Sequence, residues 1–155
     1  MITIRKATLK NRKAIWRLQI LAIEETCKSH YSQEEIQAWT RLLKPERYDN
    51  AICRKELFVA EEHGSVVGFG QLDSENSRIE ELYVHPGYTG RHIGSHILQA
   101  MESAAAKAGV KTLHLTATLN AVPFYEKAGY SMQLYRKYLL PSGQVACVLL
   151  ARELP

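Results

Sequence analysis

The sequence predicts an α/β protein in which helices flank a mixed, mostly antiparallel sheet of about seven strands. Three observations carry this prediction. Strands alternate with helices in the second half of the chain, three consecutive strands form a meander in the middle, and two amphipathic helices follow the first strand. The predicted order is βααβββαβαββ, which places helices on the faces of a sheet. The 155 residues are expected to form one domain, residues 1–155.

The first half opens with a strand over residues 2–7, in which apolar and polar side chains alternate. The next segment, residues 10–27, has two apolar stripes at helical spacing. Two stripes are typical of a deeply packed helix, although one of them could instead line a ligand groove or a partner surface. A second helix is predicted to begin at the capping box of Ser32 and Glu35 and to end before Pro45.

A meander of three strands is predicted in the middle of the chain, over residues 56–62, 65–73 and 78–85. His63 and Gly64 separate the first two strands, a spacing that indicates a tight hairpin. Gly68 and Gly70 lie inside the second strand. Glycine there usually marks a bulge or a close approach of another backbone.

The second half is expected to hold two helices, each ended by a glycine, and a closing hairpin. The helices are predicted over residues 91–108, ending at Gly109, and over residues 120–128, ending at Gly129. The strands are predicted over residues 112–117, 130–140 and 144–152, with the hairpin turn at Pro141, Ser142 and Gly143.

Composition narrows the function classes. The formal charge of +4 fits attraction for an anionic ligand, but the basic residues are scattered and form no aromatic–basic stripe, so no nucleic-acid partner is expected. No segment is long and apolar enough for a membrane span, and the N-terminus lacks the pattern of a signal peptide. The three cysteines, Cys27, Cys53 and Cys147, are widely spaced and suggest reduced thiols in the cytoplasm.

The segment LYVHPGYTGRHIG, residues 82–94, organises the rest of the chain. A strand, a glycine-bearing loop and a long helix meet there, and such junctions direct backbone N–H groups and a helix dipole at one anion, usually a phosphate. The loop alone is weak support for a nucleotide site. It has neither the Gly-Lys-Ser/Thr of a Walker loop nor the position and glycine spacing of a Rossmann fingerprint.

A second segment, NAVPFYEKAGY at residues 120–130, follows one strand after the long helix. Alone, it is best interpreted as a packed aromatic pair with a glycine at the helix end. Together with IEELYVHPGYTGRHIGSHIL at residues 79–98, in this order and separation, it resembles the GNAT superfamily of acetyl-CoA-dependent N-acetyltransferases. The likeness extends over nearly the whole chain and implies the GNAT fold. The family loop pattern Gln/Arg-x-x-Gly-x-Gly/Ala is altered here: Thr89 replaces Gln/Arg and His92 replaces the first glycine, whereas Gly94 is retained.

The resemblance implies acetyl-CoA as the co-substrate and assigns residues to its binding. The residues implied to contact it are Leu82, Tyr83, Val84, Thr89, Gly90, Arg91, His92, Ile93, Gly94, Ser95, Asn120, Phe124, Tyr125 and Lys127. Backbone N–H groups of residues 91–95 would face the pyrophosphate, and Gly90 permits the tight entry turn. Val84 would hydrogen-bond the pantetheine arm, with Asn120 and Tyr125 on its other side. Lys127 could meet a phosphate or be a solvated surface lysine.

The implied reaction is direct attack of a neutral amine on the acetyl group in a ternary complex. Within the resemblance, the Val84 N–H would stabilise the carbonyl oxygen as it gains negative charge. Tyr125 would protonate the departing thiolate or donate a hydrogen bond to it. Glu80 and Glu81 lie on the central strand and are expected to face opposite sides of it. Either carboxylate could take the amine proton, directly or through water, and either could be a solvated strand residue.

The acceptor is expected to be a small-molecule primary amine. A peptide or protein N-acetyltransferase and a non-catalytic acyl-CoA-binding protein are the alternatives. In this family the first two helices and the last hairpin shape the acceptor site, here residues 20–39 and 135–138. A homodimer is possible. His92 and His96 have the i, i+4 spacing of a metal pair, but no third ligand is apparent and no metal is expected.

Overall fold

The computed structural model describes residues 1–140 and 143–155 and contains one seven-stranded sheet. The spatial order of the strands is β1-β2-β3-β4-β5-β7-β6. Their bounds are β1 Thr3–Lys6, β2 Leu57–Glu62, β3 Ser65–Asp73, β4 Arg78–Val84, β5 Thr112–Thr118, β6 Ser131–Leu140 and β7 Gly143–Glu153. The β4–β5 pair is parallel and the other neighbours are antiparallel. The predicted fold class is therefore confirmed. The turn predicted at Pro141 and Ser142 lies outside the described residues.

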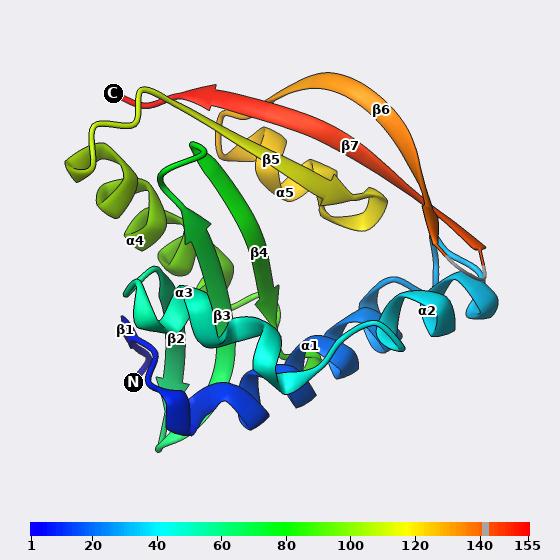
Figure 1. Ribbon diagram of the computed structural model, residues 1–155, viewed down its shortest axis with the longest axis horizontal. Helices are drawn as coiled ribbons and strands as arrows, with labels where there is room; N and C mark the ends of the chain where they lie inside the picture. The colour runs from blue at the N-terminus through cyan, green and yellow to red at the C-terminus, as the bar shows by residue number, and fades with distance from the viewer. Residues whose placement is uncertain (141–142) are drawn as a thin grey trace.

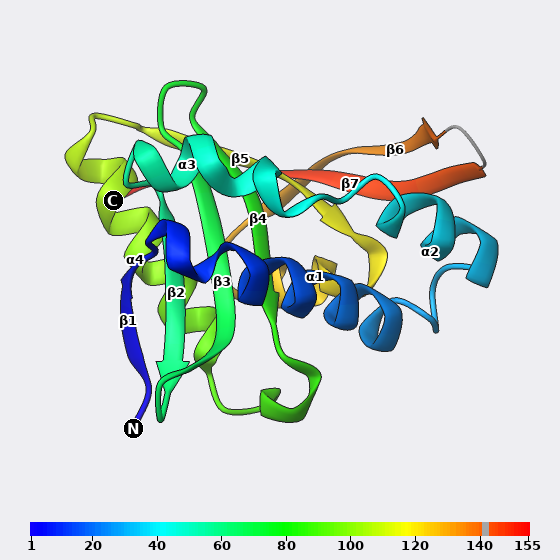
Figure 2. The same ribbon diagram turned by 60° about the horizontal axis from the view of Figure 1, so that its bottom comes forward.

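Helices cover both faces of the sheet (Figures 1 and 2). On one face lie α1 Arg12–Thr26, α2 Gln33–Thr40 and α3 Asp49–Cys53, and on the other lie α4 Ile93–Lys107 and α5 Val122–Lys127. Four short 3-10 helices join them: η1 Leu9–Asn11, η2 Pro45–Tyr48, η3 Pro86–Tyr88 and η4 Leu119–Ala121. The pair η2–α3 was not predicted, because the four residues of η2 and the five of α3 are too few to show apolar periodicity. Among the described residues, no helix is long and apolar enough to cross a membrane.

The two apolar stripes of α1 pack in different directions. Ile15 and Leu18 lie under the sheet in a cluster that includes Phe69. Ile23 packs with Ile36 of α2 in a second buried cluster. Both stripes are thus mainly packing surfaces, the first of the two interpretations that the sequence allowed, and Ala22 of the first stripe also lines the cavity described below. The predicted capping box of α2 is present, with the Glu35 N–H donating to Ser32 Oγ at 3.1 Å.

Close approach of α4 explains the two glycines inside β3, and a β-bulge also lies beside Gly68, because Ala60 pairs with Gly68 and Glu61 with Val66. A Cβ at Gly68 would lie 2.9 Å from Ile97 Cδ1, and a Cβ at Gly70 would lie 2.6 Å from Ile97 Cγ2. Met101 of α4 would crowd the Gly70 position as well. The missing side chains let α4 lie directly on β3.

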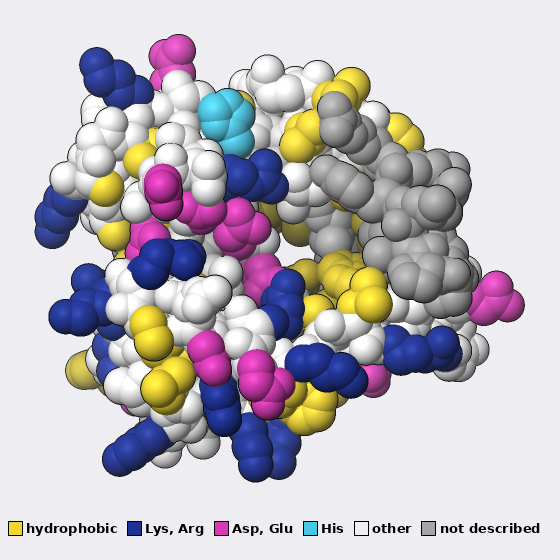
Figure 3. Space-filling view, viewed as in Figure 1, with side chains coloured by type: hydrophobic (Ala, Val, Ile, Leu, Met, Phe, Trp, Pro, Cys, Tyr) yellow, Lys and Arg dark blue, Asp and Glu magenta, His cyan; other side chains and the backbone are white. Residues whose placement is uncertain are grey.

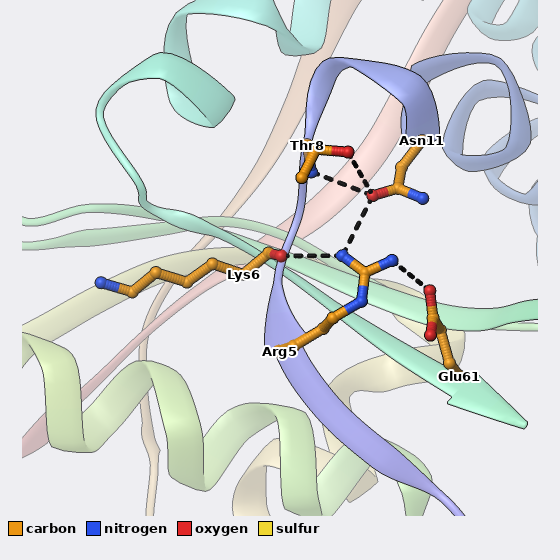
Figure 4. A network of polar contacts seen from close by, with 5 residues as sticks. All are labelled: Arg5, Lys6, Thr8, Asn11 and Glu61. Carbon is orange, nitrogen blue, oxygen red and sulfur yellow. Dashed lines mark hydrogen bonds and ion pairs between the residues drawn. The ribbon is translucent and has the colours of Figure 1, made fainter. Parts of the chain in front are cut away.

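A polar network joins the N-terminal strand to the sheet and to the start of α1 (Figure 4). Arg5 Nη1 donates to the Lys6 carbonyl at 2.9 Å and to Asn11 Oδ1 at 3.2 Å, and Arg5 also pairs with Glu61 of β2. The Thr8 N–H donates to the same Asn11 oxygen at 2.9 Å. One guanidinium thereby sets the direction in which the chain leaves β1 and enters α1.

Candidate active site

A cleft opens where β4 and β5 diverge. Within the described residues, their parallel pairing covers Arg78 with His114 and Ile79 with Leu115, and then ends. Beyond this point the strands enclose a cavity of about 280 Å³. Its lining comes from α1, β4, the loop after η3, α4, β5, η4 and α5, and the residues are Ala22, Thr26, Ile79, Glu80, Glu81, Leu82, Tyr83, Val84, Thr89, Gly94, Leu115, Thr116, Ala117, Thr118, Asn120, Ala121, Phe124 and Tyr125. The space-filling view shows acidic and basic side chains gathered beside the hollow of this face (Figure 3).

The end of β4 presents a free backbone donor to the cleft. The His85 N–H donates to the Val67 carbonyl of β3 at 2.8 Å. Successive N–H groups of a strand point to opposite edges, so the Val84 N–H points away from β3, toward β5. Because β5 has already diverged there, this N–H can reach a ligand that lies between the strands.

The N-terminus of α4 closes the same end of the cleft with unpaired backbone donors. Among the described residues, no N–H of residues 90–95 donates to a backbone carbonyl. Gly90 has φ +79°, which allows the chain to turn sharply into the helix. Free N–H groups and the positive end of the helix dipole together form an anion site. This arrangement can hold an anion such as a phosphate.

The helix begins two residues later than predicted, at Ile93 instead of Arg91, because His92 has a left-handed conformation (φ 60°, ψ 19°). In the family pattern a glycine stands at this position, and the backbone angles explain the preference. A left-handed conformation costs a non-glycine residue about 1–2 kcal/mol. The imidazole is exposed and no hydrogen bond fixes it as a side-chain cap of α4.

We therefore expect His92→Gly to leave coenzyme A affinity within about threefold, because the backbone N–H groups remain. Relief of strain offsets the greater freedom of glycine in the unfolded chain, about 0.5–1 kcal/mol, so the melting temperature should hold or rise. His96→Gly is the matched control. His96 is exposed but lies inside α4, where glycine costs about 1 kcal/mol. Calorimetry and melting curves of both variants test this, and a lower melting temperature for His92→Gly than for His96→Gly would contradict it.

Gly94 and Phe124 form the contact between the anion loop and α5. A Cβ at Gly94 would lie 3.3 Å from the Phe124 ring and 3.6 Å from Val84 Cγ2. Both residues line the cavity. Because Gly94 has no side chain, the Phe124 ring can lie close to the N-terminus of α4 and form one wall of the cleft.

Tyr125 lies on α5 with its ring packed against Phe124 and Tyr130, at centroid distances of 5.1 and 5.7 Å. The residue is only 6% exposed and lines the cavity. Burial raises the pKa of its hydroxyl well above the ordinary value, so the phenol keeps its proton at neutral pH. Such a group can donate a hydrogen bond to negative charge that develops in the cleft.

Glu80 and Glu81 do not follow the simple alternation expected for β4. Leu72 pairs with Ile79 and Gln71 with Glu81, so Glu80 is the extra residue of a β-bulge. Both residues line the cleft. Glu80 is exposed and pairs with Arg78 at 3.5 Å, whereas the Glu81 side chain is only 11% exposed. The bulge therefore separates a solvated carboxylate from a buried one.

Burial raises the pKa of Glu81, against the opposing effect of Arg47 and Gln19. Glu81 Oε1 accepts from Gln19 Nε2 at 3.1 Å and from Arg47. A carboxylate with a raised pKa beside a cleft is a typical general base.

Several predicted residues lie at the edge of the cleft rather than in its lining. The Arg91 guanidinium binds Glu62 at 2.6 and 3.1 Å and lies over the Tyr88 ring, so only its backbone faces the anion loop. The Ile93 side chain is buried in the core. Ser95 is half-buried and Lys127 is exposed.

Sequence reasoning missed residues from β5 and from α1. Thr116 and Thr118 form the wall opposite β4. Gln19, 1% exposed, contacts Glu81 from α1. A signal for Gln19 was present, because it stands four residues after Ile15, on the apolar side of its helix. Nothing in the sequence marked the partner of Glu81 on η2, Arg47.

Comparison with known proteins agrees with this geometry. A sequence model of the family described as Acetyltransferase (GNAT) domain matches residues 27–137. The uncharacterized N-acetyltransferase YafP of Escherichia coli (strain K12) is 28% identical over 111 residues, which cover 72% of this chain and 69% of that protein.

Two solved structures share the fold over nearly their whole length. A GCN5-related N-acetyltransferase from Rhodopseudomonas palustris matches with a TM-score of 0.84 at 24% identity, covering 98% of this chain and 95% of that chain. The PaiA N-acetyltransferase from Thermoplasma acidophilum, solved in complex with coenzyme A, matches with a TM-score of 0.79 at 22% identity, covering 99% of each. Since the family model spans most of the sequence and includes both motifs that line the cleft, the chain belongs to the GNAT acetyltransferase family.

Proposed function

We propose that this enzyme transfers the acetyl group of acetyl-CoA to a primary amine of a small molecule, by direct attack in a ternary complex. The observation that carries the proposal is the cleft between β4 and β5, because it joins a free strand N–H at Val84, an anion site at α4 and a buried phenol at Tyr125. PaiA, which has the same fold, was solved with coenzyme A.

Acetyl-CoA would supply the thioester, and the chain's own groups would act around it. The N–H groups of residues 91–95 would hold the pyrophosphate, and the Val84 N–H would stabilise the carbonyl oxygen as negative charge builds on it. The C–N bond forms as the C–S bond breaks. Glu81 would take the proton lost by the amine, through water, and Tyr125 would donate its hydroxyl hydrogen to the departing sulfur.

A small acceptor fits the way the cleft ends. The Leu119 N–H donates to the Tyr31 hydroxyl at 2.9 Å, which ties the turn after α1 to η4. Helix α2 also contacts β7 on this side. These contacts restrict the open groove that an extended polypeptide would need, and this favours a small amine over a protein acceptor.

The test is acetyl-CoA consumption across a panel of polyamines, aminoglycosides, amino acids and peptides, with mass spectrometry of the products. We expect turnover with at least one small primary amine and an acetylated product. Turnover with peptides alone would replace the proposal by a peptide N-acetyltransferase. Coenzyme A binding without turnover on any amine would favour a non-catalytic acyl-CoA-binding protein.

A further inference from the structure

A polar cluster, buried except for its arginine, stands behind Glu81, on the α1 side of the sheet. It joins Gln19 of α1, Arg47 and Tyr48 of η2, and Glu81 of β4. Gln19 is 1% exposed and Tyr48 is fully buried. A buried glutamine with all its partners on other elements is costly to desolvate unless it is fully hydrogen-bonded, so its contacts define one arrangement.

The hydrogen bonds fix the orientation of the Gln19 amide. Its Oε1 accepts from Arg47 Nη1 at 3.3 Å and from the Tyr48 hydroxyl. With two donors on the oxygen, the amide nitrogen must face Glu81, where it donates to Oε1 at 3.1 Å. If the amide were inverted, its NH₂ group would face the Arg47 and Tyr48 donors, and its oxygen would face the carboxylate of Glu81. Both arrangements are unfavourable.

The two oxygens of Glu81 are treated differently by this cluster. Oε1 accepts from both Gln19 and Arg47. Oε2 is buried and has no hydrogen-bond partner among the described residues. A proton that arrives at the carboxylate therefore meets one oxygen occupied by two donors and one that is free.

The charges around Glu81 come from few groups. Arg47 is the cation that contacts it, while Glu80 on the same strand opposes its ionisation. Tyr48 and Tyr83 face it as neutral phenols, because burial and the negative charge of Glu81 raise the pKa of both. Burial raises the pKa of Glu81 and so favours its protonated form, and Arg47 is the main influence in the opposite direction.

We propose that Arg47 and Gln19 are positioning residues that keep Glu81 ionised and leave Oε2 as its proton-accepting atom. The inference rests on the proposed role of Glu81 as base. Neither side chain needs to touch the acceptor. Arg47 supplies the positive charge, and Gln19, held on α1, orients the Glu81 carboxylate through its hydrogen bond to Oε1.

The test is the pH profile of kcat/KM for an acceptor amine at saturating acetyl-CoA in Arg47→Met. Glu81 works as a base only when ionised, so the rate falls as the pH drops through its pKa. Loss of the cation raises that pKa, and we expect the acidic limb to move up by about one to three pH units. Arg47→Lys, which keeps the charge, should restore most of the profile.

Arg12→Met is the matched control. Arg12 pairs with Asp49 at 2.9 Å and has the same 37% side-chain exposure as Arg47, but it lies outside the cluster. Its loss should leave the acidic limb in place. Infrared difference spectra against Glu81→Gln add a readout independent of turnover: at neutral pH the protonated carboxyl band should appear in Arg47→Met and be absent in wild type.

Two failures can be told apart. If Glu81→Gln retains wild-type activity, the base assignment in the proposed function is wrong. If Glu81→Gln loses activity while Arg47→Met keeps the wild-type acidic limb and shows no protonated carboxyl band, the positioning role is wrong and the base assignment survives. Should Arg47→Met melt too early for kinetics, Arg47→Gln removes the same positive charge while keeping an amide that can donate a hydrogen bond, and it gives the same comparison.

Discussion

Replacing Gly94 by glutamate is expected to abolish measurable coenzyme A binding while leaving α4 folded. The new side chain would start 3.3 Å from the Phe124 ring and would extend into the cavity that Gly94 lines. Its carboxylate would meet the phosphates at the helix N-terminus. Bulk and like charge together should lower affinity by at least about 10²-fold, since each factor of ten corresponds to 1.4 kcal/mol. A carboxylate in the first helical turn is favourable for the helix itself.

Calorimetry with coenzyme A, together with melting curves, separates loss of the site from loss of the fold. Gly94→Gln carries similar bulk without charge and should bind more tightly than Gly94→Glu. Gln99→Glu adds the same charge at an exposed position of α4 and should bind normally. A folded Gly94→Glu protein with wild-type affinity would place the phosphates elsewhere.

The anion loop could be predicted from sequence because its chemistry depends on backbone groups of consecutive residues. A strand, a glycine-bearing loop and a helix in one segment determine where those groups point. The same holds for the capping box of Ser32 and Glu35, which acts within four residues. The local structure differs from the prediction where η3 forms inside the loop and where the left-handed conformation of His92 delays the helix, and the binding role of the loop stays a prediction.

The surroundings of Glu81 could not be predicted, because they depend on contacts between distant segments. A bulge at Glu80 shifts the alternation of β4, and no residue type in the sequence marks it. Gln19 and Arg47 stand 62 and 34 residues from Glu81. Gln19, a polar residue on the apolar side of its helix, indicates that a buried polar partner exists, but the sequence does not identify that partner. The short α3, which follows η2, left no periodic pattern.

Tyr125→Phe is expected to lower kcat on the order of 10²- to 10⁴-fold with little change in acetyl-CoA affinity. The ring packs between Phe124 and Tyr130, and phenylalanine preserves both contacts. What is lost is one hydroxyl of a buried residue that lines the cleft. Removing it should change the free energy of unfolding by only about 1 kcal/mol.

The raised pKa of Tyr125 also predicts how the loss of activity in Tyr125→Phe depends on pH. Because burial keeps the phenol protonated well above neutral pH, the loss in Tyr125→Phe should be the same throughout the neutral range. This differs from the effect of Arg47→Met, which should deepen as the pH falls. Tyr130→Phe is the matched control, since its hydroxyl donates to Glu102 at 2.9 Å, away from the cavity lining, and its removal should affect stability more than kcat.

The comparison requires that chemistry, not product release, limits turnover, and single-turnover measurements establish this. If Tyr125 only packs the wall, Tyr125→Phe and Tyr130→Phe will both keep kcat within about threefold of wild type, with altered melting temperatures. If Tyr125 acts on the leaving sulfur, only Tyr125→Phe will slow the chemical step.

A second test replaces acetyl-CoA by a thioester whose thiol is more acidic. Because a better leaving group depends less on a proton donor, the loss of kcat in Tyr125→Phe should be smaller with this thioester.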